Sequence, residues 1–378
     1  MPRKDTESGK SRDESKVTKK SAKVTVNTPV VPAIPPKHVY RWDLDKTYLK
    51  SEFETVRDLF RAAFEGAEKK QAVPGAAALL REIRKRDGAR VCFISGSPRQ
   101  MRKVLTKKLQ LDGVEFDEFI LKPNLGNLFR GRFRAMREQV GYKLPALLAG
   151  RSGLPDETKE TCFGDDAEAD AFVYSLYADL LSGRVDRALL EKVLAAARVY
   201  PDDAKRTLSL ADSVALARAQ PEPVERIFIR LDKHSPTARF DRYGARLCPV
   251  YNYFQAAMVL LEDGLVDENA VIRVALEMVD RFDYTLDALR NSLQDLLRRG
   301  RLRMETTHRL AARLDEGIEP LGSLPPSREL LARFADRVRA LPPPPEGTRP
   351  PEKTQRPIDY LRAFAEDASP KRHSAQAS

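Results

Sequence analysis

The chain has 378 residues, of which 42% are hydrophobic and 32% are charged, and its formal net charge is +11. This composition excludes a fully disordered chain and a collagen-like one, and the length allows about two or three domains. The three cysteines form no CxxC pair, which excludes a disulfide scaffold and a zinc ribbon. No apolar run approaches the ~20 residues of a spanning helix. We therefore expect a cytoplasmic protein without a transmembrane segment.

Basic residues are concentrated at the N-terminus. Residues 1–37 hold nine Lys/Arg and four Asp/Glu, so they supply +5 of the net charge. Residues 1–36 have few large apolar side chains, which predicts a disordered basic arm. The rest of the chain has a mild basic bias. This bias favours anionic partners such as phosphate esters, anionic lipid or nucleic acid, and an ordinary soluble surface accounts for it equally well.

Strand and helix patterns alternate between residues 37 and 249. Strands are predicted at residues 38–44, 90–94, 116–121, 160–163 and 224–231. Helices are predicted between them, at residues 52–65, 76–86, 98–109, 144–149 and 168–181. This alternation predicts an α/β domain over 37–249, with a Rossmann-like parallel sheet and helices on both of its faces.

The pattern changes after this domain. Apolar residues at helical spacing predict helices at 252–262, 268–281, 286–299, 304–314 and 328–340, and no strand is evident. We therefore expect an all-helical module over residues 250–340. The tail at 341–378 is rich in proline, which predicts disorder, with one or two helical turns at 358–364.

The first motif whose residues could take part in a reaction is DLDKT, which begins at the end of the first predicted strand. It contains Asp43, Asp45 and Thr47. Two carboxylates held close together are costly unless a cation or a shared proton offsets their repulsion, so the pair suggests Mg²⁺ and acid–base chemistry. Alone, such a pair is more often a turn or a helix cap.

Two further signals suggest phosphate binding. Ser95-Gly96-Ser97-Pro98 follows a buried strand and precedes a helix, where a hydroxyl and free backbone N–H groups can hold a phosphate. An ordinary helix cap is the simpler explanation of this motif alone. Lys143 lies before an apolar helical segment, from which it could neutralise a phosphate or a carboxylate, but a single lysine has no diagnostic value.

The fourth signal is the acidic run GDDAEAD at 164–170, which follows another predicted strand. Asp165, Asp166 and Asp170 lie in this run. Clustered carboxylates favour a hard cation such as Mg²⁺, and an acid-rich first turn of a helix is the alternative. All four signals lie at the carboxyl ends of strands, where open α/β sheets bind ligands.

The sequence resembles the haloacid dehalogenase superfamily of phosphatases, because it carries that superfamily's motifs in the same order: DxDxT, a serine, a lysine and an acidic GDD cluster. More narrowly, SGSP at 95–98, Pro74-Gly75 and GDDAEADAFVY at 164–174 resemble the phosphatidate phosphatase catalytic domain of the actin-patch-associated type. The resemblance covers residues 40–180. Lys46 and Asp166 depart from the family pattern, which usually has Asp and Ser at these positions.

The resemblance implies roles for these residues. Asp43 would be the nucleophile that forms an aspartyl-phosphate, and Asp45 would protonate the leaving group. Ser95, Gly96 and Thr47 would contact the substrate phosphate, and Lys143 would balance its charge. The implied ligands of Mg²⁺ are Asp43, the Leu44 carbonyl, Asp45, Asp165, Asp166 and Asp170, with either Asp166 or Asp170 completing the site.

Three functions remain open at this stage. The first is Mg²⁺-dependent hydrolysis of a phosphomonoester, such as phosphatidate at a membrane surface, which would add peripheral membrane association. The second is a related phosphatase that acts on a nucleic-acid end or a small phosphometabolite. The third is a non-catalytic scaffold whose helical module docks a protein partner. The intact Asp43, Asp45, Lys143 and Asp165 argue against the scaffold.

Overall fold

The structure is a computed structural model, and it describes residues 35–50, 71–122, 132–216, 222–318, 327–349 and 356–368. The described residues belong to one compact unit. The predicted helix at 52–65 and the predicted basic arm, as far as residue 34, lie outside the described residues. The same holds for parts of the proline-rich tail.

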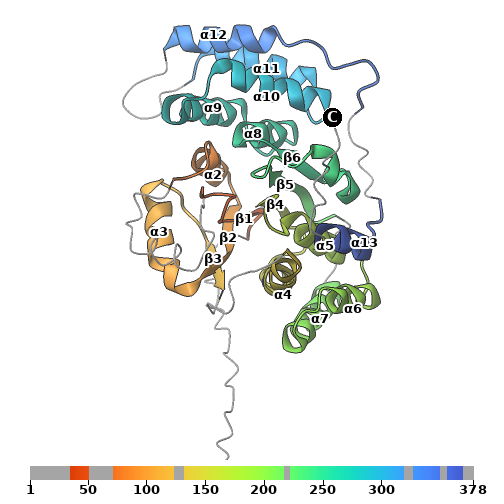
Figure 1. The fold of residues 1–378 in the computed structure, drawn as a ribbon. Helices are drawn as coiled ribbons and strands as arrows, with labels where there is room; N and C mark the ends of the chain where they lie inside the picture. Colours follow the sequence, from red (N-terminus) through yellow and green to blue (C-terminus); the bar gives the residue numbers. More distant parts are fainter. Residues whose placement is uncertain are drawn as a thin grey trace, which may run out of the picture. The chain divides into compact units, whose positions relative to one another are not determined.

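A six-stranded parallel sheet forms the centre of the fold (Figure 1). The strands run in the order β3-β2-β1-β4-β5-β6, and adjacent strands pair in parallel. Their bounds are β1 His38–Asp43, β2 Ala89–Pro98, β3 Glu118–Lys122, β4 Lys159–Asp165, β5 Val224–Arg230 and β6 Leu247–Val250. This topology confirms the predicted α/β fold. The direction of the strand order reverses between β1 and β4, and open α/β sheets bind ligands at the carboxyl ends of the strands at such a point.

Helices cover both faces of the sheet. In the α/β part they are α2 Ala76–Arg84, α3 Arg102–Leu111, α4 Arg132–Arg151, α5 Asp170–Ser182, α6 Arg187–Ala196 and α7 Pro201–Leu216, with the 3₁₀ segments η2 Arg99–Met101 and η3 Thr237–Tyr243. Successive strand residues face opposite sides, so Trp42, Phe93 and Phe163 belong to one core, and Ile94 and Cys162 belong to the other. The apolar run VCFI at 91–94 in β2 is buried throughout, as expected for a parallel strand that is covered on both faces.

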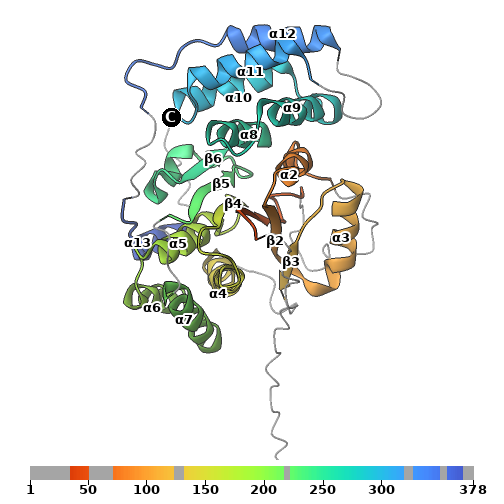
Figure 2. The ribbon, with the colours of Figure 1, turned by 180° about the vertical axis from the view of Figure 1, so that it is seen from behind.

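The predicted C-terminal helical module is present. It comprises α8 Tyr253–Glu262, α9 Glu268–Phe282, α10 Leu286–Arg298, α11 Met304–Glu316 and α12 Arg328–Arg339. Four of these helices begin at a side chain that caps the first turn, namely Asn252, Asp267, Thr285 and Ser327. Figures 1 and 2 show α8 to α12 on one side of the sheet and α4 to α7 on the other. The module shares its apolar core with α2 and with that sheet face.

Several elements differ from the sequence-based expectations. Helix α4 is much longer than the predicted segment at 144–149 and continues through Pro145. Strand β6 and helices α6 and α7 were not predicted. The tail contains a helix of nine residues, α13 Tyr360–Ala368, in which Tyr360, Ala363 and Phe364 are buried. The expected disorder of the tail therefore does not extend to this helix. None of the described helices is long and apolar enough to cross a membrane.

Candidate active site

Four segments meet at the carboxyl end of the sheet. Asp43 is the last residue of β1, and Asp45 lies in the turn that follows it. The loop SGSP ends β2, and the acidic loop at 165–169 joins β4 to α5. Helix α4 contributes Lys143, whose side chain is completely buried. The structure thus brings the four sequence signals to one place.

Lys143 lies at the centre of a carboxylate cluster. Its Nζ donates hydrogen bonds to Asp43 Oδ1 at 2.7 Å, to Glu168 Oε2 at 2.9 Å and to Asp170 Oδ1 at 2.5 Å. Burial alone lowers the pKa of Lys143, but these carboxylates outweigh burial and raise it well above the usual value. Lys143 therefore stays charged, and it offsets the repulsion among the three acids.

The same burial acts on the nucleophile candidate. Burial raises the pKa of Asp43 well above its usual value, and Lys143 opposes this rise. Burial likewise raises the pKa of Asp165, and its acidic neighbours Glu168 and Asp170 add to the effect. Both carboxyl groups therefore need a nearby positive charge if they are to remain ionised at neutral pH.

Oxygen ligands for a metal ion are available beside this cluster. One oxygen each of Asp43, Glu168 and Asp170 lie within 4.8 Å of one another, but the Lys143 ammonium already bonds to all three residues. Asp43 Oδ2, in contrast, is buried and has no hydrogen-bond partner among the described residues. This second oxygen of Asp43 is therefore the better candidate ligand, and a hard cation fits the oxygen-only donor set.

Asp165 anchors the acidic loop. Its Oδ1 accepts the backbone N–H of Ala167 at 2.6 Å and that of Glu168 at 3.0 Å. Its Oδ2 accepts only the Thr47 hydroxyl among the described groups, at 3.2 Å. Thr47 is thus placed between the first motif and the acidic loop, where it joins the two segments.

Asp45 faces the SGSP loop. Its Oδ2 accepts the Ser95 hydroxyl at 2.9 Å and the Ser97 hydroxyl at 2.7 Å, and the Ser97 N–H donates to Ser95 Oγ at 2.9 Å. Gly96 lies between the two serines and is half-buried. The candidate acid and the candidate phosphate loop therefore lie side by side, as expected if both contact one substrate.

Two predicted metal ligands are engaged elsewhere. The Leu44 carbonyl accepts the N–H groups of Tyr48 at 3.0 Å and Leu49 at 2.9 Å, so the turn after β1 uses this oxygen. Both Asp166 oxygens accept backbone N–H groups after β5, from Lys233 at 2.7 Å and from Ser235 at 3.0 Å. The geometry therefore does not bring Leu44 or Asp166 to the cluster around Lys143, whereas it does bring Asp170.

Three residues of the site were not among the predicted site residues. Glu168 bonds to Lys143, Ser97 bonds to Asp45, and Gln139 Nε2 donates to Glu168 Oε2 at 2.6 Å. Gln139 precedes Lys143 by four residues, so the two side chains lie on the same face of helix α4. This spacing could have identified Gln139 as a site residue if the full length of α4 had been predicted. Ser97 lies in the motif already recognised.

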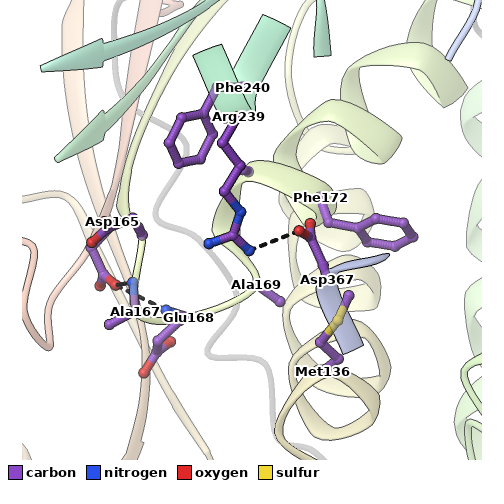
Figure 3. Close-up of a pocket in the computed structure, with 11 residues that line it drawn as sticks. Met136, Asp165, Ala167, Glu168, Ala169, Phe172, Arg239, Phe240 and Asp367 are labelled. Atoms are coloured by element: carbon purple, nitrogen blue, oxygen red, sulfur yellow. Dashed lines mark hydrogen bonds and ion pairs between the residues drawn. The ribbon is translucent and has the colours of Figure 1, made fainter. Parts of the chain in front are cut away.

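The acidic loop at 165–169 also lines a small cavity of about 50 Å³. Figure 3 shows Asp165 and Glu168 on one side of it, with Phe172, Phe240 and Arg239 around it. Arg239 donates to Asp367 of α13 at 2.8 Å. The last helix that the structure describes, α13, therefore contributes Asp367 to the wall of this cavity.

Comparison with known protein families identifies a match for part of the chain. Residues 42–192 match the family model of the phosphatidate phosphatase APP1 catalytic domain. The matched region runs from Trp42, beside Asp43, through the acidic loop and α5, so it includes all four segments described above. The match confirms the family suspected from the motifs. No curated protein matches the chain.

Proposed function

Residues 42–192 form a phosphatase catalytic domain of the phosphatidate phosphatase APP1 family, and on this premise we propose that the chain hydrolyses a lipid phosphomonoester through an aspartyl-phosphate on Asp43. The observation that carries the proposal is the set of contacts that the two Asp43 carboxyl oxygens make. One of its oxygens bonds to the Lys143 ammonium, and the other is buried without a partner among the described residues.

In the first step an Asp43 oxygen forms a bond to phosphorus while the bond to the leaving oxygen breaks. Asp45 gives its proton to that oxygen, so the product leaves as an alcohol. In the second step Asp45 takes a proton from water, whose oxygen attacks phosphorus and releases phosphate and the Asp43 carboxylate. Ser95 and Ser97 hold the Asp45 carboxyl group during both steps. The Lys143 ammonium, which bonds to Asp43, favours the ionised form of this carboxyl group and so opposes the effect of burial on its pKa.

Mg²⁺ is the proposed cofactor. Asp43 Oδ2 and Asp165 Oδ2 are the ligand candidates, because the first has no partner among the described residues and the second accepts only the weakly placed Thr47 hydroxyl there. When bound, Mg²⁺ would reduce the repulsion between an anionic nucleophile and an anionic ester. The absence of His and Cys from these positions disfavours zinc.

The substrate is proposed to be phosphatidate or a similar lipid phosphate. The family name supports a lipid phosphomonoester, and the net charge of +11 favours approach to an anionic surface. An enzyme that works on such a lipid acts at the membrane surface, so we propose a cytoplasmic protein that associates peripherally with membranes. A nucleic-acid end or a small phosphometabolite is the alternative.

The test is a phosphate-release assay with Mg²⁺ on three substrates: phosphatidate in mixed micelles, glycerol 3-phosphate and a 5′-phosphorylated oligonucleotide. We expect phosphatidate to be cleaved far faster than glycerol 3-phosphate, because acyl contacts contribute ~0.8 kcal/mol per buried CH₂. Equal rates on these two, or a preference for the oligonucleotide, would reject the lipid substrate.

The same assay tests the mechanism. Asp43→Asn should abolish turnover while the protein remains folded, because the amide is a poor nucleophile, and EDTA should have the same effect until Mg²⁺ is added back. Asp267→Asn is a suitable control, because Asp267 caps α9 in the helical module and asparagine is an equally good cap. Full turnover of Asp43→Asn would refute the nucleophile, and full turnover in EDTA would refute the metal.

A further inference from the structure

The turn that carries Asp45 has a strained conformation. Lys46, the next residue, has a φ of 60°, in the left-handed region that a non-glycine residue rarely adopts because its Cβ then crowds the following carbonyl oxygen. Such a conformation persists when the surroundings hold it in place. The groups that hold this turn therefore help to determine where the Asp45 carboxyl group points.

Two side chains from outside the family-matched region hold the turn by its carbonyl groups. Tyr253 Oη donates to the Thr47 carbonyl at 2.7 Å, and Arg230 Nε donates to the Lys46 carbonyl at 2.8 Å. Arg230 Nη2 donates to the same Lys46 oxygen. Tyr253 is 1% exposed, and burial raises the pKa of its phenol, so the hydroxyl keeps the proton that it donates.

Tyr253 is itself held firmly by the helical module. It is the first residue of α8, next to the cap Asn252, whose side-chain amide donates to Ser292 Oγ of α10 at 2.9 Å. The Tyr253 ring stacks on Trp42, with ring centroids 5.1 Å apart, and Trp42 directly precedes Asp43. Tyr253 therefore contacts the chain on both sides of the two catalytic aspartates.

We propose that Tyr253 is a positioning residue for phosphoryl transfer: it holds the turn after Asp45, so that the Asp45 carboxyl group is aimed at the leaving oxygen, and Arg230 is the second anchor. This inference rests on the proposed function. It also gives the helical module a role in the reaction, since α8 and its contacts with α10 place the Tyr253 hydroxyl.

The sharpest test uses leaving groups that differ in their need for an acid. A p-nitrophenolate ion leaves readily without a proton, whereas an alkoxide needs one, so misplacement of Asp45 affects alkyl esters selectively. The two substrates are p-nitrophenyl phosphate and the alkyl phosphomonoester, phosphatidate or glycerol 3-phosphate, that the wild type cleaves faster. Tyr253→Phe removes one hydroxyl and keeps the stacked ring.

The matched control is Tyr360→Phe. Tyr360 is also 1% exposed, and its hydroxyl donates to the Asp179 carboxylate at 2.7 Å, away from Asp45. We expect Tyr253→Phe to lower kcat on the alkyl ester about tenfold or more, with KM unchanged and p-nitrophenyl phosphate turnover within about threefold of wild type. Tyr360→Phe should leave the ratio of the two rates unchanged.

Arg230→Lys provides a second, independent variant. It keeps the positive charge beside Asp232 but loses the pair of donors to the Lys46 carbonyl, so the same leaving-group dependence is expected. This variant decides the question if Tyr253→Phe does not fold. Equal losses on both esters, or an effect no different from that of Tyr360→Phe, would show a structural role only and overturn the inference. A wild-type protein that cleaves no phosphomonoester would instead overturn the proposed function, and the inference with it.

Discussion

At the scale of single residues, the site depends on one buried ammonium group. Lys143 bonds to Asp43, Glu168 and Asp170, and its side chain is inaccessible to solvent. Removing one partner of a buried ion pair typically costs about 3–5 kcal/mol, because the remaining charges lose their compensation. Lys143 therefore offsets the repulsion among the three acids, while the second Asp43 oxygen has no hydrogen-bond partner among the described residues.

A glycine allows this arrangement. A Cβ atom on Gly164 would lie 2.4 Å from the Asp170 Cβ, so any side chain there must push Asp170 away from Lys143. We expect Gly164→Ala to lower kcat at least about hundredfold and to destabilise the fold by about 1–3 kcal/mol. Phosphate release and urea denaturation measure the two effects.

Gly153→Ala is the control for this prediction. Gly153 lies in an exposed turn, and a Cβ atom there would meet no atom within 4 Å. The substitution should leave both turnover and stability close to the wild-type values. If Gly164→Ala behaves like Gly153→Ala, then the close approach of β4 and Asp170 is not required for activity.

From the sequence it could be predicted which segments come together at the site, but not which side chains contact each other there. Asp43, Ser95, Lys143 and Asp170 could be placed together because each follows or faces a strand end, and parallel strands end at one edge. The choice among neighbouring acids could not be made. Whether Asp166 or Asp170 completes the site depends on the path of the loop: Asp166 bonds to the backbone after β5, and Asp170 bonds to Lys143.

At the scale of whole elements, local pattern predicted most strands and helices but not the short or atypical ones. Strand β6 has four residues and contains Pro249, which is tolerated because β6 lies at the edge of the sheet. Helix α4 continues through Pro145, although proline usually ends a helix pattern. Only one or two turns were predicted at 358–364, where the structure has the nine-residue helix α13, because its partners, such as Asp179, lie far away in the sequence (181 residues before Tyr360).

Helix α13 is expected to stabilise the catalytic domain through its buried face. Phe364 is 4% exposed and packs edge-on against Phe172 of α5, with ring centroids 5.8 Å apart. Phe364→Ala should therefore lower the free energy of unfolding by about 3–5 kcal/mol, measured by urea denaturation.

Leu361, on the same helix, provides the comparison. It is 38% exposed, so Leu361→Ala should change the free energy of unfolding by less than about 1 kcal/mol. A similar, small effect of both substitutions would show that α13 does not contribute to the stability of the fold, and that its docking against α5 is weak.

At the scale of the whole molecule, the α/β part and the helical module share one core. Only Tyr251 and Asn252 separate the end of β6 from the start of α8, and Trp42, Phe163 and Tyr253 stack across the junction. The sequence marked a boundary at residue 250 because the strand pattern stops there. It could not show that the apolar faces on the two sides of this boundary pack against each other.

The charge distribution along the whole chain leads to the last prediction. Residues 1–34 hold eight Lys/Arg and four Asp/Glu, a net charge of +4, and their removal would leave a chain of net charge +7. A basic residue near an anionic membrane contributes about 1 kcal/mol to binding, and salt screens this attraction. Deleting residues 1–34 should therefore weaken binding to vesicles that contain phosphatidate at least about tenfold at low salt, and the difference should shrink as salt rises.

Vesicle co-sedimentation measures the binding, and p-nitrophenyl phosphate turnover, which needs no membrane, should be unchanged. Equal binding of the two chains at low salt would exclude the N-terminal charge as a membrane-binding determinant, and loss of turnover on the soluble ester would mean that these residues contribute to the active site itself.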